Sequence, residues 1–396
     1  MTQILKTDVL IFGGGVAGLW LLNRLRSAGY SAWLMEKDAL GAGQSIASQG
    51  MIHGGIKYAL GGKLTNASTT IADMPSHWSN CLTGEGDVDL RGCNLLSDAY
   101  YMWPGNSLRS RLNAFLGSKA LEARVNKVDA ADYPVFFRDN IPGPLYRLQD
   151  IVFDVPSLLQ TLADRQKDSI FKIDWDKATL AKDESDQISG LVFENGTRIE
   201  ARQYIFCCGA GTQDLMENMD MKAARMQRRP LQMVMVKHNI ADPLYVHCVS
   251  DKLTMTPEVT ITSHLNGKGE PVWYLGGEIA ERGTNQSEGE LIDSARLKLK
   301  QLFPWVSFDN ASWAGLPIDR AEEQQAGGGR PDTETITEKG NLMVCWPTKL
   351  TLSPSLANQV IARIQARDLQ PSGELPAESP DFLERPVVAK TPWEHL

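Results

Sequence analysis

A series of glycines near the start of the chain has the spacing of a phosphate-binding loop. Gly13, Gly15 and Gly18 form the pattern G-x-G-x-x-G directly after a short apolar run, DVLIF. In such a loop the first glycine permits a tight turn, the second lets the backbone approach a pyrophosphate, and the third lets a helix pack closely on a strand. The free N–H groups of the helix that follows can bind phosphate oxygens. The pattern therefore predicts a dinucleotide at the start of the first helix.

The segments around these glycines have the order and the lengths of a β-α-β unit. Residues 8–12 predict a buried strand, residues 16–28 have apolar positions at helical spacing, and residues 31–36 predict a second strand. Glu36 ends the second strand, where a carboxylate can accept hydrogen bonds from a ribose diol. An acid at this place favours FAD or NAD over NADP. The alternative, a glycine-rich turn beside a solvated acid, does not explain why all these features are in register.

Residues 41–58 distinguish FAD from NAD. Their sequence, GAGQSIASQGMIHGGIKY, resembles that of FAD-dependent glycerol-3-phosphate dehydrogenases and, more loosely, the L-2-hydroxyglutarate dehydrogenases and amino-acid oxidoreductases of the D-amino-acid oxidase superfamily. The resemblance implies an α/β fold, with a Rossmann-like FAD-binding domain and an inserted α+β substrate domain built on an antiparallel sheet. It also implies an oxidoreductase in which the substrate passes a hydride to flavin N5. The matching residues are Ser45, Ala47, Ser48, Ile52, His53, Gly54, Gly55 and Tyr58.

The loop pattern and the resemblance together give the residues expected to bind FAD. Glycines in residues 41–58 let the backbone approach a flat ring, and Ser45 and Ser48 can donate to phosphate or ring oxygens. Residues 205–212, IFCCGAGT, resemble a second FAD-contacting strand and turn of the superfamily. The expected cofactor-binding residues are Gly13, Gly15, Val16, Ala17, Gly18, Glu36, Lys37, Gln44, Ser45, Ser48, Gln49, Gly50, Met51, Gly209, Gly211, Lys349, Leu350 and Thr351.

Basic side chains are the candidates for the chemistry itself. Residues 348–352, TKLTL, resemble the glycine-lysine-leucine-threonine segment that faces the flavin in the dehydrogenases, which implies that Lys349 favours the anionic reduced flavin. His53 would lie close to the flavin ring and is the candidate base for the substrate hydroxyl. The alternative is a structural histidine bonded to the backbone. Lys57 and Arg330 are the candidates for holding a substrate anion.

The chain departs from the dehydrogenase pattern where that family holds its phosphate. The family has an arginine just after a serine-glycine-valine segment, whereas the corresponding residues 313–318 are WAGLPI. Lys57 stands where the family has another arginine. Lysine keeps the positive charge but cannot donate the two parallel hydrogen bonds of a guanidinium. Thr348 replaces a glycine, and the long C-terminal helical extension is missing. We therefore expect a small anionic hydroxy compound other than glycerol 3-phosphate.

The remaining segments predict two domains. Residues 230–280 alternate apolar and polar side chains and predict an antiparallel sheet, while polar and acidic residues 319–341 predict a long loop. The tail from Gln370 onward predicts an extended arm or a mobile end. Other expected elements are helices near 65–78 and at 154–166 and 354–366, a hairpin at 188–199 turning at Asn195-Gly196, and strands at 203–208 and 342–346. The expected domains are an FAD domain of residues 1–80, 150–225 and 310–396 and a substrate domain of residues 81–149 and 226–309.

Composition limits the classes of partner that we expect for this protein. A net charge of −8, from 40 Lys and Arg against 48 Asp and Glu, gives no basic surface for nucleic acid. The 6 cysteines include no C-x-x-C pair, so we expect reduced thiols, no bound metal and a cytoplasmic protein. No apolar stretch is long enough to span a bilayer, although peripheral contact with the inner face of the membrane stays open.

Other functions remain open beside oxidation of a hydroxy compound. The same hydride geometry suits an amine or amino acid, and a non-catalytic subunit can also hold a flavin. A pyridine-nucleotide reductase would need a second G-x-G-x-x-G, which the sequence lacks. The electrons should therefore come from an organic small molecule and pass to oxygen, a quinone or an electron-transfer protein. The resembled dehydrogenases hold FAD non-covalently, so we expect no bond to His53.

Overall fold

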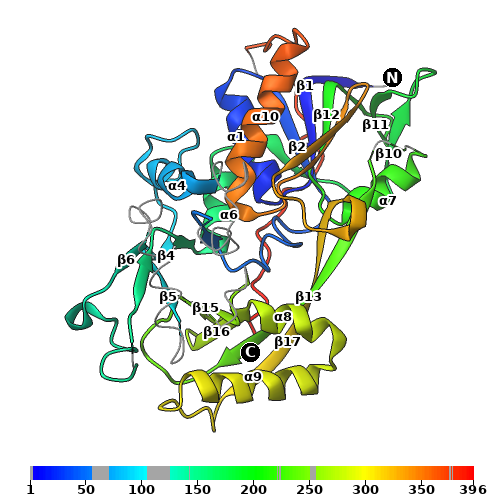
Figure 1. Cartoon of the computed structure of the whole chain (residues 1–396). Helices are drawn as coiled ribbons and strands as arrows, with labels where there is room; N and C mark the ends of the chain where they lie inside the picture. The colour runs from blue at the N-terminus through cyan, green and yellow to red at the C-terminus, as the bar shows by residue number, and fades with distance from the viewer. Residues whose placement is uncertain are drawn as a thin grey trace.

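The structure, a computed structural model, has two halves that meet at a narrow waist (Figure 1). The N-terminus lies in one half and the C-terminus in the other. Within the described residues the strands form sheets of eight, eight and three strands. This mixed architecture agrees with the fold class expected from the sequence. The structure describes residues 3–55, 71–104, 125–141, 143–220, 222, 224–249, 256–373, 376 and 378–396.

The first sheet contains the expected β-α-β unit. Its strands are β1 (Ile4–Phe12), β2 (Ala32–Glu36), β9 (Ile170–Lys172), β10 (Ala178–Lys182), β11 (Ile188–Phe193), β12 (Arg198–Phe206), β18 (Thr335–Lys339) and β19 (Leu342–Trp346). The order is β10-β11-β12-β1-β2-β9, and β19 pairs with β12 and β18. Parallel pairing of β1 with β2 and β12 brings their carboxyl ends to one edge, where nucleotide-binding folds hold their ligand. The expected hairpin is confirmed, with Gly196 in its turn at φ 84°.

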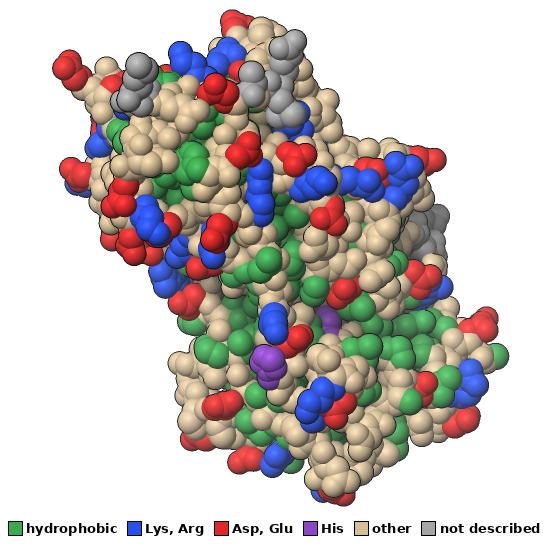
Figure 2. Space-filling view, turned by 180° about the vertical axis from the view of Figure 1, so that it is seen from behind, with side chains coloured by type: hydrophobic (Ala, Val, Ile, Leu, Met, Phe, Trp, Pro, Cys, Tyr) green, Lys and Arg blue, Asp and Glu red, His purple; other side chains and the backbone are tan. Residues whose placement is uncertain are grey.

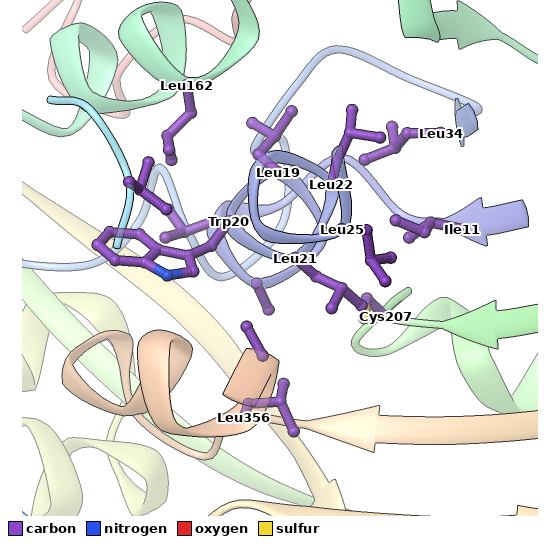
Figure 3. Close-up of a cluster of buried hydrophobic side chains, with 14 of the residues drawn as sticks. Ile11, Leu19, Trp20, Leu21, Leu22, Leu25, Leu34, Leu162, Cys207 and Leu356 are labelled. Carbon is purple, nitrogen blue, oxygen red and sulfur yellow. The ribbon is translucent and has the colours of Figure 1, made fainter. Parts of the chain in front are cut away.

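Helices enclose α1 against this sheet. They are α1 (Val16–Ser27), α6 (Val155–Asp164) and α10 (Ser353–Ala366). Figure 3 shows Leu162 of α6 on one side of α1 and Leu356 of α10 on the other, with Ile11 and Leu34 of the sheet beside it. All these side chains and Trp20 belong to one buried cluster. Because α1 is apolar on almost every side, burial fixes its direction and therefore the place to which its N-terminus points.

The second sheet is the antiparallel sheet expected from residues 230–280, extended by strands on both sides. Its strands are β5 (Tyr100–Trp103), β6 (Val125–Lys127), β7 (Tyr146–Leu148), β13 (Met226–Lys237), β14 (Val246–Cys248), β15 (Val259–Leu265), β16 (Pro271–Gly276) and β17 (Ser312–Glu323). Their order is β17-β13-β16-β15-β14-β5-β7-β6. Helix α9 (Glu288–Leu302) packs on one face, where Leu291 and Leu299 meet Val234 and Trp273. The opposite face is left for the first half of the molecule.

Short elements connect the halves. A small sheet holds β3 (Met51–Ile52), β4 (Leu95–Ser97) and β8 (Ile151–Phe153), and the remaining helices are α4 (Met74–Thr83), α7 (Gly211–Asn218) and α8 (Glu278–Arg282). The helix expected near 65–78 lies partly outside the described residues, and α4 continues past it. No helix in the described part of the chain combines the length and apolarity that crossing a bilayer requires.

The prediction of a long loop at residues 319–341 is wrong. Strand β17 extends to Glu323, and β18 occupies Thr335–Lys339. Among the described strands β18 pairs only with β19 and β17 only with β13, so both are edge strands. Charged residues are common on edge strands because they oppose pairing with another molecule. Although β17 falls in the range 310–396 assigned to the FAD domain, it pairs with β13 of the second sheet. The division into two domains stays a prediction.

The C-terminal tail is an extended arm that joins the two halves. Leu40 N donates to Val387 O at 2.8 Å, and Ala389 N donates to Leu40 O at 3.0 Å. From there the arm, the red segment in Figure 1, crosses to the second sheet. Trp393 is 3% exposed and lies 4.1 Å from the ring of His264. The arm therefore closes the structure across the waist.

Replacing Trp393 with alanine should destabilise the fold. Truncation of a buried tryptophan leaves a cavity and costs about 3–5 kcal/mol in the free energy of unfolding. Urea unfolding monitored by far-ultraviolet circular dichroism, which does not rely on tryptophan fluorescence, measures the change in the free energy of unfolding. Phe382→Ala is the matched control, since Phe382 is 46% exposed and lies earlier in the same arm. Equal losses in the two variants would show that Trp393 does not anchor the arm.

Candidate active site

The glycine loop is closed so tightly that a side chain at Gly13 or Gly18 would clash with the backbone. Gly13 has φ 106°, and a Cβ atom there would lie 2.5 Å from Cys207 O. A Cβ on Gly18 would lie 2.0 Å from Gly13 O, and one on Gly15 would lie 3.0 Å from Ser45 Oγ. The first turn of α1 has no acidic residue and no side-chain cap. This is the geometry of a helix N-terminus that binds a pyrophosphate through backbone N–H groups.

Glu36 lies beside this loop, as the sequence predicts. Its Oε2 accepts a hydrogen bond from Gly14 N at 2.5 Å, and its Oε1 accepts one from Asp38 N at 2.8 Å. A carboxylate has further lone pairs, so Glu36 can also accept from ribose hydroxyls. Lys37, another predicted cofactor residue, lies at the surface with its Nζ 3.8 Å from Asp38.

Residues from three parts of the chain surround the start of α1. Ser45 Oγ accepts from Val16 N at 3.1 Å, and Ala17 follows in the first turn. Gln44 lies against Gly209, whose added Cβ would be 3.2 Å from Gln44 Nε2. Gly211 begins α7 close by. These predicted cofactor residues are thus brought together at one edge of the first sheet.

Beyond this point the predicted segment turns toward the second sheet. Ser48 Oγ accepts from Gly50 N at 3.3 Å. The side chain of Gln49 donates to Tyr274 O at 3.0 Å, and the Tyr274 hydroxyl donates to Ala47 O at 2.9 Å. The Gln49 amide therefore ties the halves together and faces away from the phosphate loop.

The segment around His53 meets the predicted lysine segment. Met51 lies in β3, and His53, which is 6% exposed, donates from its backbone N to Thr351 Oγ1 at 3.3 Å. Trp78 Nε1 donates to Thr351 O at 3.2 Å. Asp150, which the sequence did not indicate, accepts from Gly54 N at 2.8 Å. Residues almost three hundred positions apart therefore lie in contact and form one wall.

Two of the predicted cations, Lys349 and Arg330, lie near one loop. Lys349 Nζ donates to Asp332 O at 2.8 Å, and Leu350 begins the turn that ends at Leu352. Arg330 is exposed in the same loop as Asp332. Lys57 lies outside the described residues, as does Tyr58, so the structure says nothing of their places.

Arg320 was not among the candidates predicted from the sequence. It lies on β17 opposite Arg229 of β13. Burial first, and then the charges of Arg229 and Arg330, lower its pKa to about 10, so the guanidinium is still protonated at neutral pH.

A separate cluster has the side chains of a metal site. Atoms of His77, Cys81 and Asp87 lie within 4.8 Å of one another. Asp87 already accepts from His77 Nε2 at 2.9 Å and pairs with Arg24 Nε at 3.1 Å. Burial raises the pKa of Cys81 to about 12, which keeps its thiol protonated. The cluster is explained by the link that it makes between α4 and α1.

Comparison with known proteins identifies the family. The family model described as DAO, FAD dependent oxidoreductase, matches residues 8–342. The chain belongs to this family. A probable FAD-dependent oxidoreductase of Pseudomonas aeruginosa is 44% identical over 396 residues, which cover 100% of this chain and 99% of that protein. The expected superfamily is confirmed: the chain is an oxidoreductase with FAD as its cofactor, and the tight glycine loop, the uncapped helix and Glu36 fit that cofactor.

Several solved structures share the fold. An FAD dependent oxidoreductase from Pseudomonas aeruginosa superposes with a TM-score of 0.85 at 40% identity, covering 100% of this chain and 99% of that one. Glycine oxidase from Geobacillus kaustophilus gives 0.63 at 16% identity, covering 91% and 95%. L-α-glycerophosphate oxidase from Mycoplasma pneumoniae, with FAD bound, gives 0.65 at 14% identity, covering 98% and 99%. At such identities the last two demonstrate the fold alone.

Replacing Gly18 with alanine should weaken FAD binding. The new methyl group would press on Gly13 O and move the loop, and a forced contact of this kind costs about 1–3 kcal/mol, which corresponds to about tenfold to a hundredfold in affinity. Titration of the apoprotein with FAD measures the dissociation constant. Gly289→Ala is the control because its added Cβ would meet nothing within 4 Å. Unchanged FAD affinity in Gly18→Ala would mean that the loop does not bind the pyrophosphate.

His264 should make stability depend on pH. It is buried against Trp393, with its Nε2 2.9 Å from Thr262 Oγ1, and burial lowers its pKa to about 3. Because an unfolded histidine has a pKa of about 6.5, the unfolded chain binds more protons below that pH, and stability falls as the pH falls. Between about pH 7 and pH 5 this loss amounts to about 2 kcal/mol.

Urea unfolding at both pH values of wild type, His264→Asn and His395→Asn tests this dependence. The loss on acidification should shrink in His264→Asn and persist in His395→Asn, whose side chain is exposed. If His264→Asn loses as much stability as the wild type on acidification, then His264 is not buried in its neutral form.

Proposed function

We propose that the protein oxidises a small anionic hydroxy compound, taking a hydride from the carbon that bears the hydroxyl group. The observation that supports this is the wall formed by the His53 segment and the Thr351 turn, with cations nearby. FAD, when bound, supplies the hydride acceptor at flavin N5. The chain must then supply a base for the hydroxyl proton and a cation for the anionic group.

His53 is our choice for the base. The imidazole can take the hydroxyl proton at one ring nitrogen as the hydride leaves the neighbouring carbon, which converts the alcohol to a carbonyl. Its backbone bond to Thr351 and the bond from Gly54 N to Asp150 hold the backbone of the segment at two successive residues. A base held in this way loses little freedom when the substrate binds.

Lys349, Lys57 and Arg330 are proposed to attract the anionic group. Lys349 lies two residues before Thr351, and its ammonium is held on the loop that carries Arg330. Positive charge beside a reacting centre stabilises negative charge that develops there. This arrangement suits a carboxylate or phosphate better than a neutral polyol.

An amino acid is the second candidate substrate. It too has a carboxylate, and structural neighbours of this chain include proteins described as glycine oxidase, L-proline dehydrogenase and L-amino acid deaminase. A neutral amine loses a hydride without a base for a hydroxyl proton. The part played by His53 therefore separates the two candidates.

The proposal also covers the electron acceptor and the cellular compartment. We assign the protein to the cytoplasm or the inner face of the membrane, since all 6 cysteines are free thiols. Reoxidation by oxygen, by a quinone or by an electron-transfer protein can be compared directly once a reductant is known.

Anaerobic addition of hydroxy acids, polyol phosphates and amino acids to the purified holoprotein tests the proposal. An anionic hydroxy compound should bleach the visible absorbance of the oxidised flavin. Bleaching by amino acids alone would favour the second candidate. A flavin that dithionite reduces but no compound of the panel reduces would support a non-catalytic, flavin-holding role.

Replacing His53 with glutamine should slow flavin reduction by a hydroxy compound about 10²–10⁴-fold, because general base catalysis is lost. Stopped-flow absorbance measures the rate in a single turnover. His77→Gln is the control, since His77 lies on α4 and is paired with Asp87. Reduction of His53→Gln at the wild-type rate would remove His53 as the base.

A further inference from the structure

A buried carboxylate lies behind the turn that leads into α10. Glu334 directly precedes β18 and is 6% exposed. Figure 2 shows acidic and basic side chains interspersed over one face of the molecule, where water and neighbouring charges screen them. Glu334 is removed from water, so its charge acts over a longer distance than the charge of a surface residue.

The contacts of Glu334 are made with neutral groups. Its Oε1 accepts hydrogen bonds from Ser355 Oγ and Gln359 Nε2 of α10. Its Oε2 is buried and has no hydrogen-bond partner among the described residues. The guanidinium of Arg363 donates to Gln359 Oε1 at 3.2 Å and does not pair with Glu334. Two neutral donors therefore hold a carboxylate whose charge no ion pair of the described residues cancels.

The turn in front of Glu334 lies at the ligand-binding edge of the first sheet. Strand β19 pairs in parallel with β12, and β12 pairs in parallel with β1, so the carboxyl ends of all three strands reach the same edge. The phosphate loop follows β1 at this edge, and residues 347–352 follow β19 there. Sheets of this kind bind their ligands outside the carboxyl ends of the strands. The topology therefore favours this turn as a wall of the FAD site.

Helix α10 begins at the same turn with its positive end. It starts at Ser353, and its first turn has no acidic residue and no side-chain cap. The free N–H groups of a helix start carry about half a positive charge. Together with the ammonium of Lys349, this charge stabilises negative charge on a bound ligand. Glu334 contacts Ser355 in the first turn of α10 and Gln359 in the next, so a full negative charge opposes the helix start.

We propose that Glu334 makes the bound flavin harder to reduce, and thereby makes the reduced flavin a stronger reductant toward its electron acceptor. Uptake of two electrons and one proton converts the neutral oxidised ring to a reduced ring with one negative charge. A buried carboxylate nearby raises the free energy of that charge and has little effect on the neutral ring. Lys349, in the same turn, has the opposite effect. The difference between the two effects sets the reduction potential.

This assignment does not depend on which compound the protein oxidises. It requires FAD, the cofactor of the family, and a charge near the site of the ring. Glu334 contacts α10 and not the reacting atoms, so it is a residue that tunes the cofactor and not a catalytic residue. The proposed oxidation and the role of Glu334 can therefore be tested separately.

Anaerobic titration of the holoprotein against a reference dye of known potential tests the proposal. In Glu334→Gln, which keeps the shape and removes the charge, the equilibrium constant for flavin reduction should rise at least about tenfold, or about 30 mV for a two-electron couple. Glu334→Met, a second neutral variant of similar length, should show the same rise. Lys349→Met should lower the constant. Mere loosening of the turn would shift all three variants in one direction, so opposite signs identify charge as the cause.

Glu338→Gln is the matched control. Glu338 lies on β18, four residues after Glu334, and pairs with Arg363 Nε at 2.8 Å and with Arg367 at the other end of α10. Because two guanidinium groups cancel its charge there, its loss should leave the equilibrium constant unchanged. An unchanged constant in the FAD-containing Glu334 variants, or an equal shift in Glu338→Gln, would overturn the proposal. A rise in Lys349→Met would overturn it as well.

The dye titration uses no substrate, so it is independent of flavin reduction by the panel of compounds. A raised constant in Glu334→Gln, with no reduction of the wild type by any hydroxy compound, would contradict the proposed oxidation alone. Reduction by a hydroxy compound, with the same constant in Glu334→Gln and wild type, would contradict only the role of Glu334.

Discussion

The contact between Gly18 and the carbonyl oxygen of Gly13 is the constraint on which the rest of the structure depends. It lets α1 lie directly on β1, and the apolar helix is then enclosed by α6, α10 and the sheet. Because the helix cannot rotate without exposing leucines, its N-terminus stays aimed between Ser45 and Gly209. The burial of a helix in one half thereby determines where negative charge is bound at the edge of the sheet.

The site itself depends on contacts between the halves. Gln49 donates to Tyr274 O and the Tyr274 hydroxyl donates to Ala47 O across the waist, and Trp393 carries the C-terminal arm onto the same sheet. Such bonds are made between residues more than two hundred positions apart, so each one fixes a large loop of chain. An inserted sheet held by both its own connections and a terminal arm can present a stable wall to a ring bound on the other half.

The sequence predicts the parts of this protein that are encoded locally. The first β-α-β unit, the Asn195-Gly196 hairpin and the strand Leu342–Trp346 depend on periodicity and turn residues within short windows. The extent of β17 and the presence of β18 could not be obtained in this way, since their charged residues are typical of loops and only their pairing with β13 and β19 makes them strands. Arg320 was missed for the same reason: its face is defined by a partner strand far away in the chain.

The charged groups at the end of β13 and β17 lie apart from the packing around the glycine loop. Proteins with this fold and less than a fifth of the same residues are described as acting on glycine and on glycerophosphate. In this chain the glycine loop fits the cofactor, whereas on the facing sheet residues two or four positions apart along a strand stay on the same side. Here Glu322 neutralises Arg229 and so limits the repulsion between Arg229 and Arg320. Specificity can therefore change along a strand without disturbing the packing that positions the flavin.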